Sequence, residues 1–200
     1  MCGRYYIAID DHDEEIAEYF RQAQGRAFRM GTDMIKSGEV RPTNIAPVLA
    51  PSAAGRNISA FPMRWGFSHP TRGMLVFNTR SETADQKSMF AESVTKRRCA
   101  IPASCYFEWK KGENDKKQRY SFNTWNDEIL FLAGLYLKVP GISLPCFTIL
   151  TMDAAPNIKD IHARMPVILP RSNVPLWVSG ETPFSGLTES IITDIKAVRG

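Results

Sequence analysis

The first four residues, Met1-Cys2-Gly3-Arg4, place a thiol next to the start of the chain. If the initiator methionine is removed, Cys2 carries a free α-amine and a thiol on adjacent carbons. The amine has an ordinary pKa of about 7.7–8.0 and the thiol one of about 8.5, so both are partly reactive at neutral pH. Such a 1,2-aminothiol can condense with an aldehyde to an imine and then close its sulfur onto the same carbon as a thiazolidine. A cysteine inside a chain has no free amine and cannot form this ring.

Two other roles fit the same tetrapeptide. The amine could act as the base for the thiol in acyl transfer, which is the arrangement of N-terminal nucleophile enzymes. Alternatively, Cys2 is a small buried hydrophobic residue at the start of an edge strand. The tetrapeptide alone leaves all three roles open.

Glu108 is a carboxylate within the aromatic segment Tyr106-Phe107-Glu108-Trp109. The two-residue period of a strand puts Tyr106 and Glu108 on one face, and Phe107 and Trp109 on the other. In an apolar pocket this carboxyl would have a pKa raised toward neutrality and could act as a general acid and base. On a solvated face it would instead pair with a nearby lysine such as Lys110.

Other polar residues lie at the ends of expected strands. His162 precedes a core strand and is the histidine best placed for acid–base chemistry, although a loop histidine can equally be exposed. Asn78 and Arg80 occupy alternate positions, where an amide and a guanidinium could hold a sugar oxygen and a phosphate. The alternatives are turn formation by Asn78 and a surface ion pair between Arg80 and Glu82.

Trp65 lies between Arg64 and Gly66 and could be a stacking platform for a nucleic-acid base. Its apolar neighbours Met63 and Phe67 favour packing in the core instead. Base stacking requires an exposed ring, whereas packing in the core requires a buried one.

The composition is that of a globular protein. Of the 200 residues, 44% are hydrophobic and 10% aromatic, and the net charge of +4 permits a polyanionic partner without requiring one. The cysteines at 2, 99, 105 and 146 lack CxxC or zinc spacing, so we expect free thiols, a reducing cytoplasmic compartment, and no metal or cofactor. No apolar segment approaches the length of a membrane-spanning helix or resembles a signal peptide.

Many strands and a few segregated helices predict an α+β fold. Strands are expected over 2–9, 48–50, 58–67, 75–77, 99–102, 105–110, 120–124, 129–137, 146–151 and 165–169, with a turn at 112–115. Helices are expected from an N-cap at Asp11–Asp13 to Phe20, from Ser81 to about Val94, and over 174–178 and 187–198. Residues 21–39 are expected to form a loop. Nothing divides the chain, so a single domain over 1–200 is predicted.

Seven segments, taken in order, resemble the SOS response-associated peptidase (SRAP) family, whose members shield abasic sites in single-stranded DNA. The segments are Met1-Cys2-Gly3-Arg4, Asn44-Ile45-Ala46-Pro47, Arg64-Trp65-Gly66, Phe77-Asn78-Thr79-Arg80-Ser81-Glu82-Thr83, Arg98-Cys99-Ala100-Ile101-Pro102, Tyr106-Phe107-Glu108-Trp109 and Ile161-His162-Ala163-Arg164-Met165-Pro166. The resemblance covers about residues 2–178. Seven motifs in this order identify a family far more specifically than any single motif does.

The resemblance implies a single α+β domain with a β-barrel-like core and flanking helices. It also implies that Met1 is removed, a step proposed to be self-catalysed, and that Cys2 joins the deoxyribose aldehyde of an abasic site as a stable thiazolidine. On the family's pattern, Cys2 is the nucleophile, Asn78 holds the sugar, Glu108 is the proton shuttle and His162 is an acid/base. The enzyme class is therefore a DNA-crosslinking one with peptidase activity toward Met1.

The same resemblance implies a positively charged groove for single-stranded DNA. Arg4 and Arg80 fall on the family's phosphate-binding positions, and we also predict DNA contacts from Trp65 and Arg164. The expected partner is single-stranded DNA that contains abasic sites. We expect no membrane partner, a monomeric protein, and association with the nucleoid when DNA is bound.

Two segments depart from the family's pattern. Roughly residues 181–200 lack the closing strand that we expect, and residues 21–39 show no family signature. Two rival functions also remain. One is an N-terminal nucleophile amidohydrolase or cysteine peptidase, because class II glutamine amidotransferases also begin Met-Cys-Gly. The other is a non-catalytic single-stranded DNA-binding module in which Cys2 is incidental.

Overall fold

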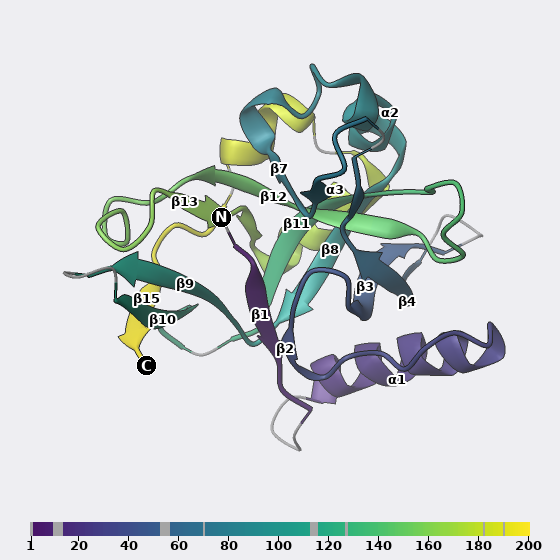
Figure 1. Ribbon diagram of the computed structural model, residues 1–200, viewed down its shortest axis with the longest axis horizontal. Helices are drawn as coiled ribbons and strands as arrows, with labels where there is room; N and C mark the ends of the chain where they lie inside the picture. The colour runs from purple at the N-terminus through teal and green to yellow at the C-terminus, as the bar shows by residue number, and fades with distance from the viewer. Residues whose placement is uncertain are drawn as a thin grey trace.

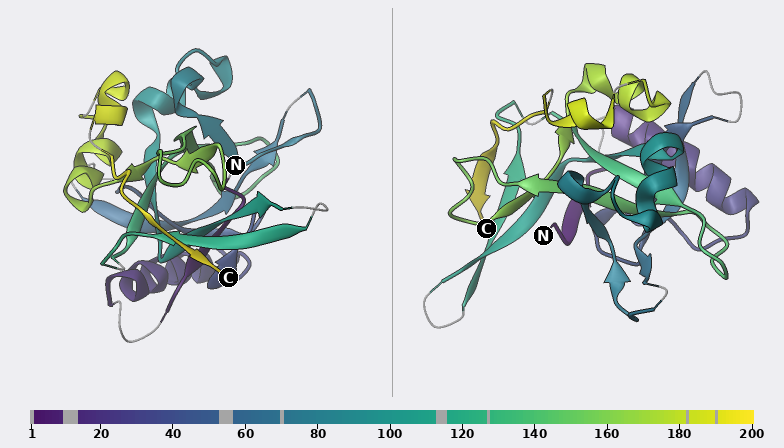
Figure 2. Two further views of the ribbon diagram at one scale, coloured as in Figure 1. Left: turned by 90° about the vertical axis from the view of Figure 1, so that its left-hand side faces the viewer. Right: turned by 90° about the horizontal axis from the view of Figure 1, so that it is seen from above.

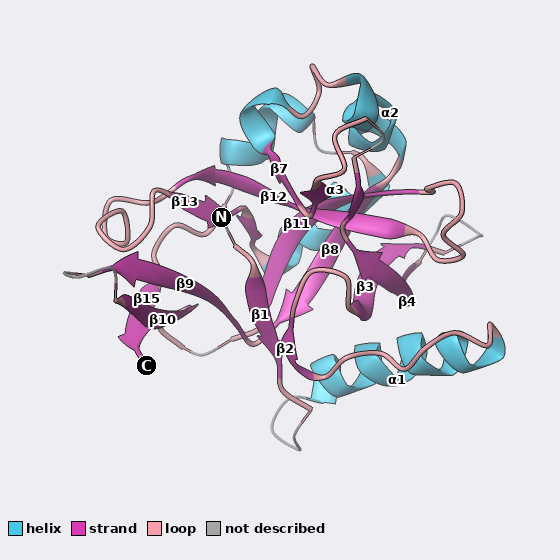
Figure 3. Ribbon diagram, viewed as in Figure 1, coloured by secondary structure: helices cyan, strands magenta, loops and turns pink. Residues whose placement is uncertain are grey.

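Strands form the centre of the molecule, and the helices lie on its outside (Figures 1 and 3). The computed structural model describes residues 2–9, 14–52, 57–69, 71–112, 116–126, 128–181, 183–189 and 191–200. Met1, the expected N-cap at 11–13 and most of the expected turn at 112–115 lie outside the described residues. Within these ranges, no helix combines the length and the apolar character that crossing a membrane requires.

The larger sheet is mixed and closes on itself. Its order is β13-β12-β4-β3-β8-β11-β14, and β12 also pairs with β11, so β12, β4, β3, β8 and β11 form a ring. The strands are β3 (Ile45–Pro51), β4 (Ile58–Trp65), β8 (Arg98–Ala103), β11 (Leu130–Leu137), β12 (Cys146–Asp153), β13 (Arg164–Pro166) and β14 (Ile168–Leu169). A short strand, β7 (Asn78–Arg80), runs parallel to β12. The predicted α+β fold with a barrel-like core is confirmed.

A second, antiparallel sheet holds the start of the chain. Its order is β15-β10-β9-β1-β2, with β15 (Lys196–Arg199), β10 (Lys117–Asn123), β9 (Cys105–Lys111), β1 (Arg4–Ile7) and β2 (Gly38–Val40). Tyr5 on β1 lies opposite both Tyr106 on β9 and Val40 on β2. These side chains are buried, whereas the neighbouring Tyr6 is exposed. Alternate residues therefore face the core and the outside, as a two-residue period requires.

Helix α1 (Glu14–Arg29) is longer than predicted. It packs along β3 and β4 through Ile16, Ala23 and Ala27, which are buried (Figure 1). The prediction that 21–39 is a loop is therefore wrong for 21–29, and for 38–39, which belong to β2. The helix is missed because its second half contacts the sheet through small alanines, which produce a weak apolar period.

The expected helix from Ser81 is broken into two pieces. A 3₁₀ turn spans Ser81–Thr83, and α2 (Ser88–Lys96) follows with Phe90 and Val94 buried. Helix α3 (Val174–Ser179) covers β8 and ends at Gly180, where φ is +83°, as a glycine at a helix C-terminus allows. A small hairpin of β5 (Phe67–Ser68) and β6 (Leu75–Val76) precedes β7.

The C-terminal segment closes the second sheet. β15 pairs antiparallel with β10, with Tyr120 opposite Arg199 and Asn123 opposite Lys196 (Figure 2). A 3₁₀ helix spans Phe184–Glu189, so the predicted helix over 187–198 is wrong for 191–198, and part of that range forms β15. The expectation that no closing strand is present is also wrong. β15 lies at the edge of the sheet and is mostly exposed, so its sequence lacks the apolar alternation that marks a strand.

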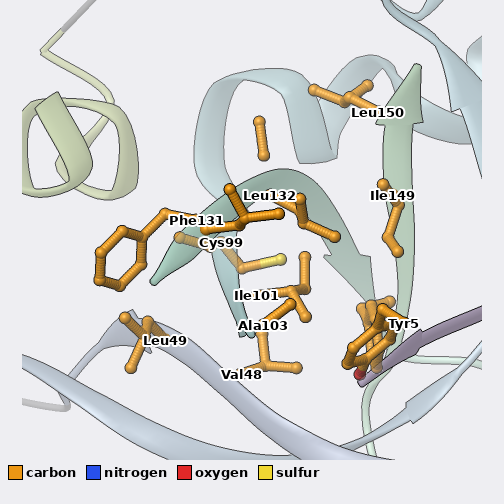
Figure 4. Close-up of a cluster of buried hydrophobic side chains, with 14 of the residues drawn as sticks. Tyr5, Val48, Leu49, Cys99, Ile101, Ala103, Phe131, Leu132, Ile149 and Leu150 are labelled. Carbon is orange, nitrogen blue, oxygen red and sulfur yellow. The ribbon is translucent and has the colours of Figure 1, made fainter. Parts of the chain in front are cut away.

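The core lies inside the ring of barrel strands. Figure 4 shows Val48, Cys99, Ile101 and Leu132 converging there, together with other buried side chains. At Gly134 on β11, an added Cβ would lie 2.6 Å from Ile101 Cδ1, so this position has no room for a side chain. The packing therefore fixes β8 against β11, and with it the frame that carries the polar residues.

Candidate active site

Cys2 lies two residues before β1, and this end of the strand lies between β9 and β13 (Figures 1 and 2). Its side chain is fully buried, and Sγ lies 3.7 Å from the carbonyl oxygen of Arg4. Burial raises the pKa of the Cys2 thiol well above its usual range, and the negative charge of Glu108 raises it further. With Met1 attached, the sulfur is therefore held as a neutral thiol.

Asn78 holds the backbone of Cys2. Its Nδ2 donates a hydrogen bond of 2.7 Å to the Cys2 carbonyl oxygen, while its buried Oδ1 has no hydrogen-bond partner among the described residues. Asn78 begins β7, and the parallel pairing of β7 with Ile149–Thr151 of β12 fixes its position. Gly66 supports this arrangement, because it has φ +83° and an added Cβ would lie 3.0 Å from Phe77 Cβ.

Glu108 and His162 come from different sheets and meet beside Cys2. Glu108 is on β9, faces inward and is 4% exposed, and its Oε1 lies 3.7 Å from His162 Nδ1. The same ring nitrogen accepts a hydrogen bond of 3.0 Å from the Arg164 backbone N–H. Burial raises the pKa of Glu108 above its ordinary value, although the nearby His162 works against this effect. This placement fits the interpretation of Glu108 as a carboxyl in an apolar pocket.

Two buried tyrosines complete the surroundings of the thiol. Tyr5 and Tyr106 face each other across β1 and β9, and neither hydroxyl has a hydrogen-bond partner among the described residues. Burial raises the pKa of both phenols, and the charges of Cys2 and Glu108 add to the effect at Tyr106. Sequence reasoning missed both as site residues. The available signal was the alternation that puts Tyr106 on the same strand face as Glu108.

The two predicted phosphate contacts are both near the surface. Arg80 ends β7 and is exposed. Arg4 is partly exposed, lies over the Trp109 ring at 4.9 Å, and donates a 3.0 Å hydrogen bond to Glu39. Both guanidiniums remain within reach of an external anion.

The predicted DNA contact at Trp65 is wrong. Trp65 is fully buried, and its Nε1 donates a 2.8 Å hydrogen bond to the carbonyl oxygen of Phe77. Its ring packs on Tyr5, Phe77 and Phe147, with centroid distances between 5.1 and 6.1 Å. The ring is therefore a core element, because β4 turns this position into the barrel and its polar N–H is satisfied internally.

The predicted DNA contact at Arg164 stays a prediction, and in this structure the guanidinium is engaged within the protein. Arg164 Nη1 bonds both Glu82 and Asp153 at 2.6 Å, and Nη2 bonds Glu82 and the Thr151 carbonyl oxygen. Only 15% of the side chain is exposed. These bonds tie β13 to β12 and to the turn after β7, so the guanidinium has a structural role beside His162.

Two pockets are each lined by one or more of these residues. One, of about 520 Å³, is lined by Glu108, Trp109, Lys111, Lys117, Lys159, Ile161, His162 and Ala163. The other, of about 740 Å³, is lined by Asn78 together with His69, Thr71, Arg72, Val76, Gln86, Lys87, Ser88, Met89 and Phe90. Each pocket combines a predicted catalytic residue with basic side chains. The basic side chains in each pocket would attract an anionic polymer.

The structure thus brings together Cys2, Asn78, Glu108 and His162, which come from widely separated segments. It buries Trp65 and engages the guanidinium of Arg164 in bonds within the protein. A barrel with this terminal cysteine site defines a protein of the SOS response associated peptidase class. The model of that family, SRAP, matches residues 1–197. The chain belongs to the SRAP family, and the match includes most of the C-terminal segment whose sequence departs from the expected pattern.

Curated relatives match over most of their length. The chain is 31% identical to the abasic site processing protein YoaM of Bacillus subtilis, over 96% of this chain and 85% of the relative. It is 28% identical to the abasic site processing protein HMCES of Xenopus tropicalis, over 92% and 68% of the two chains. A solved structure of a Bacteroides thetaiotaomicron protein superposes with a TM-score of 0.75 at 21% identity, covering 99% of this chain and 91% of that one. This last likeness shows the fold alone.

Proposed function

We propose that this chain processes abasic sites in single-stranded DNA and that it does so by joining them covalently to Cys2 after Met1 is removed. Relatives named abasic site processing proteins support the general role. The observation that carries the chemistry is the placement of Cys2 at the start of β1, with Asn78 on its carbonyl and the Glu108–His162 pair beside it.

The proposed reaction has three steps. Hydrolysis of the Met1–Cys2 peptide bond consumes one water and frees the α-amine of Cys2. This amine adds to the aldehyde carbon C1′ of the ring-opened sugar, and loss of one water gives the imine. The Cys2 sulfur then adds to C1′ while its proton passes to the nitrogen, which closes the thiazolidine. The crosslinking step is thus aldehyde plus aminothiol to thiazolidine plus water.

Glu108 is the proposed proton shuttle for these steps. Burial raises the pKa of this carboxyl above its ordinary value, which favours its protonated form. In the proposed scheme it delivers a proton to the departing water and then accepts the proton of the thiol. His162, at 3.7 Å, is positioned to exchange protons with it and to assist opening of the sugar. Ring closure matters because an imine alone favours β-elimination and strand cleavage, whereas a thiazolidine does not.

The two polar atoms of the Asn78 side-chain amide have different roles. Its Nδ2 holds the Cys2 backbone, and its Oδ1 is buried with no hydrogen-bond partner among the described residues. A buried acceptor in that state costs about 1–3 kcal/mol, and a sugar hydroxyl would remove this cost. Holding the sugar there places C1′ next to the amine and thiol, and oriented groups reach effective molarities of about 10⁵ M or more.

The proposal is tested with single-stranded oligonucleotides that carry one abasic site. The wild-type protein is expected to give a slower-migrating, heat-stable band on a denaturing gel, and Cys2→Ala is expected to lose it while keeping salt-sensitive binding. Cys105→Ala is the matched control, because Cys105 is another thiol on the adjacent strand and should crosslink normally. Undiminished crosslinking by Cys2→Ala would overturn the scheme.

Mass spectrometry tests the removal of Met1 and the product of crosslinking. The intact mass of the purified protein is expected to lack one methionine. The mass of the crosslinked N-terminal peptide is expected to equal that of the peptide plus the sugar fragment minus one water. A noncovalent complex alone would favour a simple DNA-binding module. Ammonia release from glutamine would instead favour an amidohydrolase.

A further inference from the structure

Three arginines meet on one carboxylate on the outer face of the second sheet. Glu39 Oε1 accepts hydrogen bonds of 3.0 Å from Arg4 Nη1 and 2.9 Å from Arg41 Nε, and Oε2 accepts one of 2.9 Å from Arg119 Nη2. Although burial alone would raise it, the pKa of Glu39 is lowered by these arginines, so the carboxylate stays charged. We call Glu39, Arg4, Arg41 and Arg119 the arginine cluster. It carries three positive charges and one negative charge.

The cluster is fixed in place by aromatic rings. Arg4 lies over the Trp109 ring at 4.9 Å, and Arg119 lies over the Phe107 ring at 3.8 Å. In the strand register, Arg4 is opposite Phe107 and Arg119 is opposite Trp109, so each cation covers the diagonal ring. Stacked guanidiniums keep their planar edges directed away from the rings, which suits bidentate binding of a phosphate.

The cluster is also open to an external anion. The side chains of Arg4, Arg41 and Arg119 are 34%, 59% and 40% exposed, whereas that of Glu39 is 21% exposed. A guanidinium has five N–H donors. Glu39 engages only one or two of them on each arginine in the contacts above, so donors remain for another acceptor.

The cluster is continuous with the pocket that contains Glu108 and His162. Trp109, which supports Arg4, also lines that pocket, as do Lys111 and Lys117 at the end of the β9–β10 hairpin. β10, β9, β1 and β2 are neighbours in that order in the second sheet, so the lysines of the hairpin and the arginine cluster lie on the same sheet. DNA held at Cys2 would have both groups of positive charge nearby.

We propose that the arginine cluster binds the sugar–phosphate backbone of the DNA that flanks the lesion, and that Glu39 limits its affinity for undamaged DNA by neutralising part of its charge. This inference rests on the proposed function. Arg4 is already a predicted phosphate contact there, and the inference extends that contact to Arg41 and Arg119, with Glu39 as the residue that limits it. The occupant is a phosphate backbone because the cluster offers charge and donors, and no hydrogen-bonding code for bases.

The test uses oligonucleotides with a tetrahydrofuran analogue of the abasic site, which has no aldehyde and cannot crosslink. Binding of a short oligonucleotide is compared with binding of the same lesion extended on one side or on the other. For the wild type, extension on one side is expected to tighten binding. Arg119→Gln and Arg41→Gln are expected to remove this gain and to reduce the salt slope by about 0.7 for each phosphate that is no longer neutralised. Arg21→Gln, an exposed arginine on α1 paired with Glu18, is the control and should change neither.

Glu39→Gln provides a change of opposite sign. It removes one negative charge without changing the size of the side chain, so binding of extended, undamaged single strands is expected to tighten and to become more salt-dependent. A variant that is misfolded would also bind DNA less tightly, and its thermal unfolding curve would reveal the misfolding. The inference is overturned if extension has the same effect on the arginine variants as on Arg21→Gln, or if Glu39→Gln weakens binding in a folded protein. Crosslinking by the wild type to the short, reactive oligonucleotide is measured separately, so its absence would count against the proposed function instead.

Discussion

The side-chain amide of Asn78 donates a 2.7 Å hydrogen bond to the main-chain carbonyl of Cys2, which lies 76 positions earlier in the chain. This bond joins the start of the polypeptide to the barrel, because Asn78 is held by β12. The terminal residue is therefore oriented by a rigid sheet and not by its own short strand alone. Everything proposed for the Cys2 amine and thiol depends on that orientation.

Asn78→Ala is expected to slow crosslinking by about ten- to hundredfold, because small misplacements of reacting groups have costs of this size. Noncovalent binding of the tetrahydrofuran oligonucleotide should change much less, since phosphate contacts are untouched. The rate is measured by quenching at intervals and running denaturing gels. Asn173→Ala, in the turn before α3, serves as the matched control. An unchanged rate in Asn78→Ala would show that the bond to Cys2 does not position it.

Glu108→Gln is expected to slow crosslinking by about 10²- to 10⁴-fold, the usual contribution of a positioned general acid or base. The amide keeps the size of the carboxyl but cannot carry a proton between groups. DNA binding should be retained, and binding is measured with the nonreactive oligonucleotide. Equal losses of rate and of binding would mark Glu108 as a structural residue.

The same substitution should stabilise the protein in a pH-dependent way. Because burial raises the pKa of Glu108 in the folded state, folding loses stability as pH rises from the ordinary value of 4.5 through the raised value. Glu108→Gln removes this loss. The difference in unfolding free energy between the variant and the wild type should therefore grow as pH rises from 4.5 to the raised pKa, and should stay constant above it. Urea unfolding at a series of pH values measures the gain. A gain that is independent of pH would contradict the buried, raised carboxyl.

Glu82→Gln should show the opposite sign. Its hydrogen bonds to Arg164 lower the pKa of Glu82, so its contribution is present above the ordinary value of 4.5 and is lost as pH falls through the lowered value. The variant is expected to be less stable at neutral pH by under about 1 kcal/mol, because Glu82 is nearly half exposed. At strongly acidic pH it should match the wild type. A difference that persists there would point to packing instead of charge.

Trp65→Ala is expected to lower the unfolding free energy by about 3–5 kcal/mol, as for other large-to-small changes in a core. Trp125→Ala is the control, because Trp125 is 66% exposed and should lose far less. The free energies come from urea unfolding monitored by circular dichroism, since both changes remove a fluorophore. A small loss at Trp65, together with weakened DNA binding, would restore the stacking role that the buried ring excludes.

Local pattern was sufficient to predict most strands. The alternation correctly put Tyr106 and Glu108 on one face of β9, and the structure shows that this face points inward. Local pattern was insufficient for elements that contain few large apolar residues. The second half of α1 uses Ala23 and Ala27, and β15 gains its place by pairing with β10 at an exposed edge. In both cases the deciding contacts are made with distant strands.

The polar site shows the same limit. The motifs named Cys2, Asn78, Glu108 and His162, and the structure brings them together. The motifs could not show that Arg164 is held by Glu82, which is 82 positions away, or that Trp65 faces the core. A guanidinium or an indole ring fits DNA and protein equally well. Only the positions of its neighbours decide between them.

Strand β12 pairs with β7 along one edge and with β13 along the other. Asn78 begins β7, and His162 lies two residues before β13, so a single strand sets the position of the sugar-holding amide and of the imidazole. A slip of β12 by one residue would displace both together. The amide and the imidazole therefore share one dependence, the register of β12, and a change in that register alters both sides of the centre at once.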